Sequence, residues 1–138
     1  MKLRHTVRRK IQALVVDDNN VNKKILSDLL KKIDVECSLA SNGKEACEIV
    51  KQNYKTAEEF DIIFMDIQMP IMDGIQATKH ILHFYKHDVK SPPPPVVAVT
   101  AYSISKEKQK AFLAGVSQFL TKPISAALIH NTIATYFN

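Results

Sequence analysis

Short apolar runs alternate along the chain with longer segments in which apolar residues recur every three or four positions. Such runs are typical of parallel strands covered on both faces, and the longer segments are typical of amphipathic helices. Strands are predicted at 11–16, 35–40, 61–65, 96–99 and 118–121. Helices are predicted at 20–33, around Ala46, Ile49 and Val50, and at 75–85, 106–114 and 126–137. The spacing of Val21, Ile25 and Leu29, with Leu26 and Leu30 beside them, makes the first helix amphipathic.

This alternation predicts an α/β fold. Five strand–helix repeats without internal sequence repetition indicate one five-stranded parallel sheet, because right-handed crossovers place helices on both of its faces. The flavodoxin-like strand order 2-1-3-4-5 fits best. In that order the first and third strands are neighbours where the winding direction reverses, which is where such sheets bind ligands.

Polar side chains stand where four of these strands should end. Asp17 and Asp18 follow the first strand, Asp66 the third, Thr100 the fourth, and Lys122 the fifth. Because the carboxyl ends of parallel strands share one edge of the sheet, we expect these side chains to converge there. The sequence therefore predicts a single site with three carboxylates, a hydroxyl and an ammonium.

The residue types at this site indicate metal-assisted phosphate chemistry. Three clustered carboxylates repel one another unless a hard cation neutralises them, and Mg²⁺ prefers such oxygen ligands together with phosphate oxygens. The carboxylate of Asp66 can act as a nucleophile and form an aspartyl phosphate. Lys122 and Thr100 can bind the phosphoryl oxygens. A calcium loop of the DxDxDG kind is absent from the sequence.

Four segments carry a family resemblance: 15–19 (Val-Val-Asp-Asp-Asn), 65–74 (Met-Asp-Ile-Gln-Met-Pro-Ile-Met-Asp-Gly), 99–101 (Val-Thr-Ala) and 121–123 (Thr-Lys-Pro). In this order and spacing they resemble a response-regulator receiver domain with the (βα)5 fold. The block around Asp66 is the most specific of the four. Its wording, with Asp-Asp-Asn-x-x-Asn at 17–22, is most similar to the receivers of hybrid histidine kinases.

The resemblance implies a role for each acid of the site. Asp66 would be the phosphoacceptor of a phosphorelay. Asp18 and Asp66 would bind Mg²⁺ directly, Asp17 largely through water, and Gln68 through its backbone carbonyl. Gln68 and Tyr102 would also flank the route of the hydrolytic water.

The resemblance further implies a conformational switch. Thr100, Ala101 and Lys122 would bind the phosphoryl group, and the peptide bond before Pro123 would be cis, the form that proline tolerates best. Phe119 falls at the family's aromatic switch position. Phosphorylation would move Thr100 and Phe119 and so change partner binding on the face formed by the fourth helix, the fifth strand and the fifth helix.

A histidine kinase or a histidine phosphotransfer protein would supply the phosphate. The domain would catalyse only its own phosphorylation and dephosphorylation, in the cytoplasm, either alone or within a membrane-anchored hybrid kinase. Its oligomeric state has no signature in the sequence. The main alternative is a Mg²⁺-dependent phosphohydrolase of the haloacid dehalogenase type, but Gln68 stands where its second aspartate belongs. A flavin-binding module is a further alternative. It would need a phosphate-binding loop after the first strand, where Asp17 and Asp18 would repel the phosphate.

Charge and composition separate residues 1–10 from the rest. The net charge is +5, and this segment holds five of the 19 basic residues (Lys2, Arg4, Arg8, Arg9, Lys10) and no acid. From residue 11 onward, 14 bases balance 14 acids. We therefore interpret 1–10 as a basic tail or linker and 11–138 as the receiver domain, with no nucleic-acid partner. No apolar run approaches the roughly 20 residues of a membrane span, so no membrane contact is expected of this domain.

Several other residues are expected to be structural. Asp73 should start a helix rather than bind a ligand, and Cys37 and Cys47 should be free, at least partly buried thiols. His80, His83, His87 and His130 should lie on the surface. The four prolines at 92–95 should form a stiff spacer, although a ligand for an SH3-like partner is conceivable.

Overall fold

The computed structural model describes residues 9–88, 90–101 and 105–137, and it confirms the predicted α/β fold. Five parallel strands form one sheet in the order β2-β1-β3-β4-β5. The strands are β1 (Gln12–Val16), β2 (Glu36–Ala40), β3 (Ile62–Asp66), β4 (Val96–Thr100) and β5 (Gln118–Thr121). Strands β3 and β4 thus end at Asp66 and Thr100, each one residue later than predicted.

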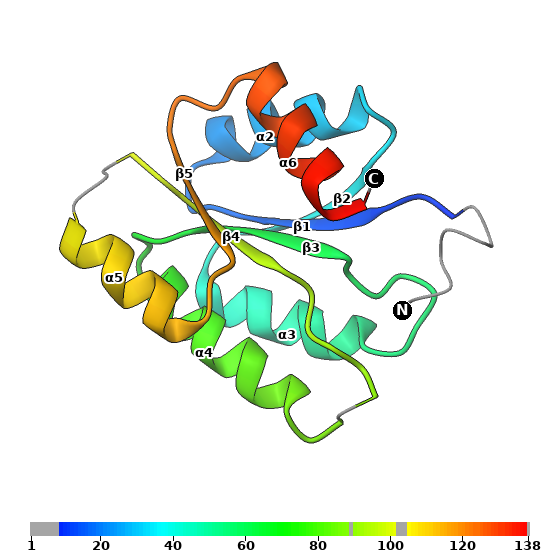
Figure 1. The fold of residues 1–138 in the computed structure, drawn as a ribbon, viewed down its shortest axis with the longest axis vertical. Coiled ribbons are helices and arrows are strands. Elements are labelled where there is room, and N and C mark those ends of the chain that lie inside the picture. The colour runs from blue at the N-terminus through cyan, green and yellow to red at the C-terminus, as the bar shows by residue number, and fades with distance from the viewer. Residues whose placement is uncertain (1–8, 89, 102–104, 138) are drawn as a thin grey trace.

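Helices cover both faces of the sheet. They are α2 (Asn20–Lys31), α3 (Gly43–Asn53), α4 (Gly74–Tyr85), α5 (Ser105–Ala114) and α6 (Ala126–Phe137). Helices α2 and α6 lie on one face, and α3, α4 and α5 lie on the other (Figure 1). Helix α2 ends at Lys31, two residues before the predicted end, and the chain turns at Asp34, whose φ is 65°.

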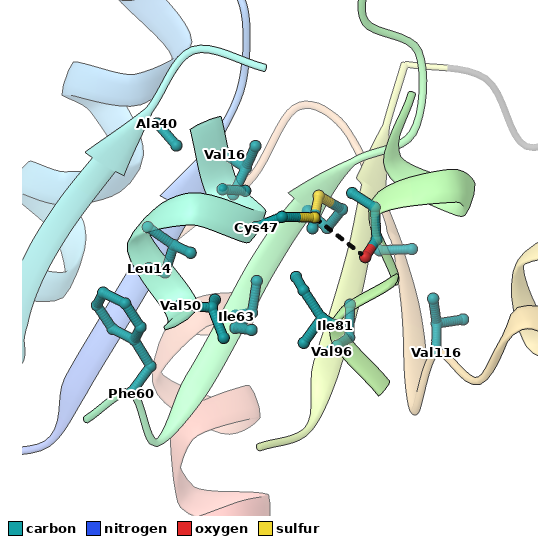
Figure 2. Close-up of a cluster of buried hydrophobic side chains, with 14 of the residues drawn as sticks. Leu14, Val16, Ala40, Cys47, Val50, Phe60, Ile63, Ile81, Val96 and Val116 are labelled. Carbon is teal, nitrogen blue, oxygen red and sulfur yellow. Dashed lines mark hydrogen bonds between the residues drawn. The ribbon is translucent and has the colours of Figure 1, made fainter. Parts of the chain in front are cut away.

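Two apolar cores hold these layers together. The core under α3, α4 and α5 includes Leu14, Val50, Phe60, Ile63 and Ile81, all at most 2% exposed (Figure 2). The core under α2 and α6 includes Leu26, Leu30, Phe64, Val97 and Ile129. Strands β3 and β4 contribute to both cores and are buried at every position. The sheet is therefore fixed from both sides, and its carboxyl edge has a rigid base.

Both cysteines are free thiols, as predicted. Cys47 is buried between α3 and α4, and its thiol donates to the carbonyl oxygen of Ala77 at 3.8 Å (Figure 2). Burial raises the pKa of the Cys37 thiol to about 11. Neither thiol is activated as a nucleophile by its surroundings.

Helix caps position the loops around the site. The side chain of Asn19 accepts from the backbone N–H of Asn22 at 2.9 Å at the start of α2. Asp73 accepts in the same way from Gln76 at 2.8 Å at the start of α4. The prediction that Asp73 starts a helix is confirmed. The cap satisfies a backbone donor that would otherwise lack a partner.

Gly74 lets α4 begin directly against the end of β3. Its backbone N–H donates to the carbonyl oxygen of Ile67 at 2.9 Å. A Cβ atom at this position would lie 2.1 Å from the carbonyl oxygen of Asp66. No side chain fits in this space, so a glycine is required for the loop that carries Asp66 to fold back on itself.

The loops at the opposite edge of the sheet are tied to each other. The hydroxyl of Tyr54 donates to the Asp88 carboxylate at 2.7 Å, and the Lys55 ammonium lies 2.8 Å from the same oxygen. Further along the second loop, Pro92 and Pro93 are exposed, whereas Pro94 is buried. With one proline packed against the domain, this run serves as the predicted spacer better than as an open ligand for another protein.

Candidate acidic phosphoacceptor site

Three carboxylates meet at the carboxyl edge of the sheet, as the strand pattern predicts. One carboxylate oxygen from each of Asp17, Asp18 and Asp66 lies within 4.8 Å of the others. Asp17 and Asp66 are each 6% exposed, whereas Asp18 is exposed. The pairing of β1 with β3, in which Val16 faces Met65, brings the three acids together.

Lys122 supplies the positive charge of the site. Its ammonium lies 2.9 Å from Oδ2 of Asp17 and 3.7 Å from Oδ2 of Asp66. The backbone N–H of Lys122 donates to the carbonyl oxygen of Thr100 at 2.8 Å, and the Lys122–Pro123 peptide bond is cis. One ammonium thus faces two largely buried carboxylates.

Backbone donors hold both buried acids in place. Oδ1 of Asp17 accepts from the N–H of Asn19 at 2.9 Å, and Oδ1 of Asp66 accepts from the N–H of Gln68 at 3.3 Å. The pKa of Asp66 is raised to about 6, first by burial and then by the Asp17 carboxylate, while Lys122 and the Gln68 N–H oppose the rise. The site therefore resists holding both charges with only one ammonium nearby.

Thr100 and Ala101 extend the site along β4. Thr100 is 3% exposed at the end of that strand, and Ala101 follows it at the surface. Asp66 stands opposite Val99 in the pairing of β3 with β4, so Thr100 is one position beyond Asp66 along the sheet. The structure thus brings the predicted residues of four strands to one edge.

Phe119 lies on β5 beside the core rather than at the acids. Its ring is partly buried, with the Phe112 ring at a centroid distance of 6.5 Å and the Lys108 ammonium 5.4 Å from its centroid. The exposed Gln68 lies next to the acids through its backbone. Tyr102 lies outside the described residues.

The donor set fits a hard divalent cation. Three carboxylates in reach of one another are oxygen ligands of the type that Mg²⁺ binds. One ammonium leaves them with excess negative charge, and the Asp17 carboxylate adds to the effect of burial in raising the pKa of Asp66. A bound cation would remove this repulsion, so the residues present suit Mg²⁺.

Sequence reasoning missed an apolar margin beside the acids. Val21 and Ile25, grouped by spacing with Leu29, are 66% and 49% exposed and do not belong to the buried face of α2. Ile71, in the loop after Asp66, is 77% exposed with φ of 73°. A β-branched residue is rare in this left-handed region. The sequence does hold a signal for the exposure of Val21 and Ile25, because both are offset along the helix from the buried pair Leu26 and Leu30.

The carboxyl edge of this 2-1-3-4-5 sheet thus carries both the acid cluster and the lysine. Residues 13–134 match the response regulator receiver domain family. The chain belongs to this family, as its motifs predicted. The haloacid dehalogenase alternative gains no support from the comparisons.

The relatives of this chain include much larger histidine kinases. The chain is 39% identical over 123 residues to the signal transduction histidine-protein kinase BarA of Escherichia coli, covering 89% of this chain and 12% of that protein. It is also 39% identical to the hybrid signal transduction histidine kinase A of Dictyostelium discoideum, covering 91% of this chain and 6% of that protein. The chain thus spans a small part of each relative.

A solved structure adds a complex. The receiver domain of the Saccharomyces cerevisiae response regulator Ssk1, crystallised with the histidine phosphotransfer protein Ypd1, is 35% identical with a TM-score of 0.82. The alignment covers 92% of this chain and 88% of that chain.

Among the described residues, none of the helices combines the length and the apolar character needed to cross a membrane.

Proposed function

We propose that this receiver accepts a phosphoryl group onto Asp66 from a phosphohistidine on a histidine kinase or a histidine phosphotransfer protein. The observation that carries the proposal is the arrangement of Asp66, which has two carboxylates within 4.8 Å and the Lys122 ammonium at 3.7 Å. A nucleophilic carboxylate beside a fixed cation suits phosphoryl transfer, where catalysis is mostly positioning and charge neutralisation.

In this reaction an oxygen of Asp66 forms a bond to phosphorus as the bond between phosphorus and the donor imidazole nitrogen breaks. The imidazole leaves with the bonding pair and ends as the neutral ring after protonation. Lys122 exchanges its contact with Asp17 for one with a phosphoryl oxygen, and Thr100 donates to another. The backbone N–H of Gln68 keeps the carboxyl group oriented.

Asp17, Asp18, Asp66 and the carbonyl of Gln68 would hold Mg²⁺, which when bound would neutralise charge shared by the acids and the phosphoryl group. Gln68 is within two residues of the phosphoacceptor, so its carbonyl is available on the same loop. We infer that the phosphorylated domain switches its partner binding through Thr100, Ala101 and Phe119. We infer that it catalyses only its own phosphorylation and dephosphorylation.

Magnesium affinity should depend on pH through Asp66. Because the pKa of this carboxyl is raised to about 6, protons compete with the metal below pH 6. Between pH 7 and pH 5, the Mg²⁺ affinity at constant ionic strength should fall by roughly tenfold. Isothermal titration calorimetry measures it, and the Asp66→Asn variant should lose most of this dependence. Equal affinity at the two pH values would contradict the assignment of Asp66 as a ligand.

The surroundings of the site favour a protein as the phosphate donor. A hollow of about 440 Å³ opens beside Lys122 between α2 and the loop that joins β5 to α6. Its lining is mostly apolar: Val15, Val16, Ile25, Leu26, Phe64, Val99, Pro123 and Ile124, with Asp17, Asn22 and Lys122 as the polar members. Val21, one helical turn before Ile25 on α2, and Ile71, in the loop after Asp66, are further exposed apolar residues. Such a surface next to a charged site suits contact with a protein.

Replacing Ile25 with glutamate should separate the two kinds of donor. Transfer from phosphorylated Ypd1, used as a surrogate donor, should slow by at least about tenfold, since the new charge would be desolvated in the contact. Phosphorylation by acetyl phosphate should keep its rate, because that donor is too small to need the apolar surface.

Rapid-quench measurement of labelled phosphate gives both rates. The matched control is Leu113→Glu, a change at an 82% exposed leucine on α5, which should leave both rates intact. Equal slowing with both donors would show that Ile25→Glu damages the site itself. Failure of the unsubstituted protein to take phosphate from any phosphohistidine donor would refute the proposed function.

We infer that the domain works in the cytoplasm, within or alongside a membrane-anchored hybrid kinase. Its free thiols suit a reducing compartment. The kinases that it matches are many times longer than this chain, which supports a role as one module of such a protein.

A further inference from the structure

A second hollow lies at the end of the molecule opposite to Asp66, between the C-terminal ends of α3 and α4. Its volume is about 420 Å³. Its lining consists of five basic side chains and one ring: Lys51, His80, His83, Lys86, His87 and Phe84. No carboxylate lines it. Helices that follow parallel strands run back to the opposite edge of the sheet, so this hollow is remote from the acidic site (Figure 1).

The helical repeat of α4 gathers the imidazoles. His80, His83 and His87 are spaced by three and four residues, which places them on one side of a helix. The helix ends at Tyr85, but the next residue, Lys86, keeps helical dihedral angles of −61° and −26°. This extension keeps His87 over the same side as the other two. All three histidines are exposed, so their ring nitrogens are open to a ligand.

An aromatic cluster fixes the floor of the hollow. The Phe84 ring packs edge-on against His87 at a centroid distance of 5.1 Å and against Tyr54 at 5.0 Å. The Lys51 ammonium, from α3, lies 5.8 Å from the Phe84 centroid. Two basic groups from different elements are therefore held to one ring.

The acid that follows His87 in the sequence is already paired. Asp88 follows His87, and its carboxylate binds the Lys55 ammonium at 2.8 Å and the Tyr54 hydroxyl at 2.7 Å. These contacts hold the pKa of the Asp88 carboxyl well below its usual range. The groups that face the histidines are thus Lys51 from α3, Lys86 from the end of α4, and this Tyr54–Lys55–Asp88 group from the neighbouring loops.

We propose that this hollow binds a multiply charged phosphate anion, such as a triphosphate. Lysine ammonium groups and protonated imidazoles are among the side chains that bind phosphate oxygens, and the hollow presents two lysines and three histidines. The flanking lysines disfavour a metal cation. Within the part of the chain that the structure describes, one group of metal-ligating side chains lies close enough together to hold a metal. It consists of the three aspartates at the other edge of the sheet. This site is independent of phosphoryl transfer to Asp66.

The test is titration of the full chain with sodium tripolyphosphate and with ATP in metal-free buffer, followed by NMR of the histidine imidazoles. Both anions should shift the resonances of His80, His83 and His87. Binding should be at least about tenfold tighter at pH 6 than at pH 8, because imidazoles gain charge as the pH falls through this range. If ATP binds more tightly than tripolyphosphate, the protein also contacts the adenosine part. If the two bind equally, the protein recognises the phosphate chain alone.

Two variants, each with several substitutions, test whether the anion binds in this hollow. His80→Gln, His83→Gln and His87→Gln together should remove the pH dependence and weaken binding at pH 6 at least about tenfold. Because the three positions are exposed, the thermal unfolding midpoint should fall only slightly, through the lost contact of His87 with Phe84. Arg8→Gln with Arg9→Gln, which removes charge from the basic N-terminal segment, should retain the pH dependence. Loss of binding in the arginine variant, or binding that is equal at both pH values, would overturn the proposal.

Discussion

Replacement of Asp66 with alanine is expected to abolish phosphorylation by acetyl phosphate. The unsubstituted protein should take up one phosphate per chain in the presence of Mg²⁺, in a linkage that is stable to acid and labile to base. Removal of a covalent nucleophile ordinarily costs many orders of magnitude in rate. In Asp66→Ala the modification should therefore fall at least about 100-fold, below detection by intact-protein mass spectrometry.

The control for this change is Asp28→Ala, which removes an exposed acid from α2 and should be phosphorylated at the normal rate. Asp66→Ala should remain folded, since it removes repulsion from Asp17 as well as a contact with Lys122. An equal yield of base-labile phosphate in the alanine variant would place the phosphoacceptor elsewhere and refute the assignment.

The second large effect is expected from Gly74→Ala. The added Cβ would lie 2.1 Å from the carbonyl oxygen of Asp66, and that backbone belongs to a buried strand with little room to move. The start of α4 and the end of β3 must then separate. We expect the free energy of unfolding to fall by about 3 kcal/mol or more, measured by urea denaturation, and phosphorylation at Asp66 to slow.

Gln76→Ala, at an exposed position two residues later on the same helix, is the matched control. It should change the free energy of unfolding by no more than about 0.5 kcal/mol. If Gly74→Ala were as stable as this control, the close approach of α4 to β3 would not be a requirement of the fold.

The strands and the acidic site could be predicted because each depends on a local and repeated signal. Apolar runs that end in a polar residue mark buried strands, and the strand order then places Asp17, Asp18, Asp66 and Lys122 at one edge. The family motifs agreed with this placement. The fold therefore followed from the period of the pattern and the rules for parallel crossovers.

Features that depend on distant partners could not be predicted in this way. Lys23 is 6% exposed and donates to the Ser41 hydroxyl at 2.5 Å, although a lysine on an amphipathic helix is usually assigned to solvent. Conversely, Val21 and Ile25 are apolar residues of the same helix and are exposed. The link between Tyr54 and Asp88 joins two loops 34 residues apart, and no spacing within either loop indicates it.

Asp66 and Lys122, which the proposed phosphorylation brings together, are attached to strands that differ in how many neighbours they pair with. Asp66 ends β3, which is hydrogen-bonded to strands on both sides and is buried throughout. Lys122 follows β5, which lies at the margin of the sheet and pairs with β4 alone. Central strands open last and marginal ones sooner. The proposed phosphoacceptor thus ends a strand that is paired on both sides, whereas Lys122, which would bind the phosphoryl group, follows a strand that is paired on one side only and can shift without breaking the pairs of β3.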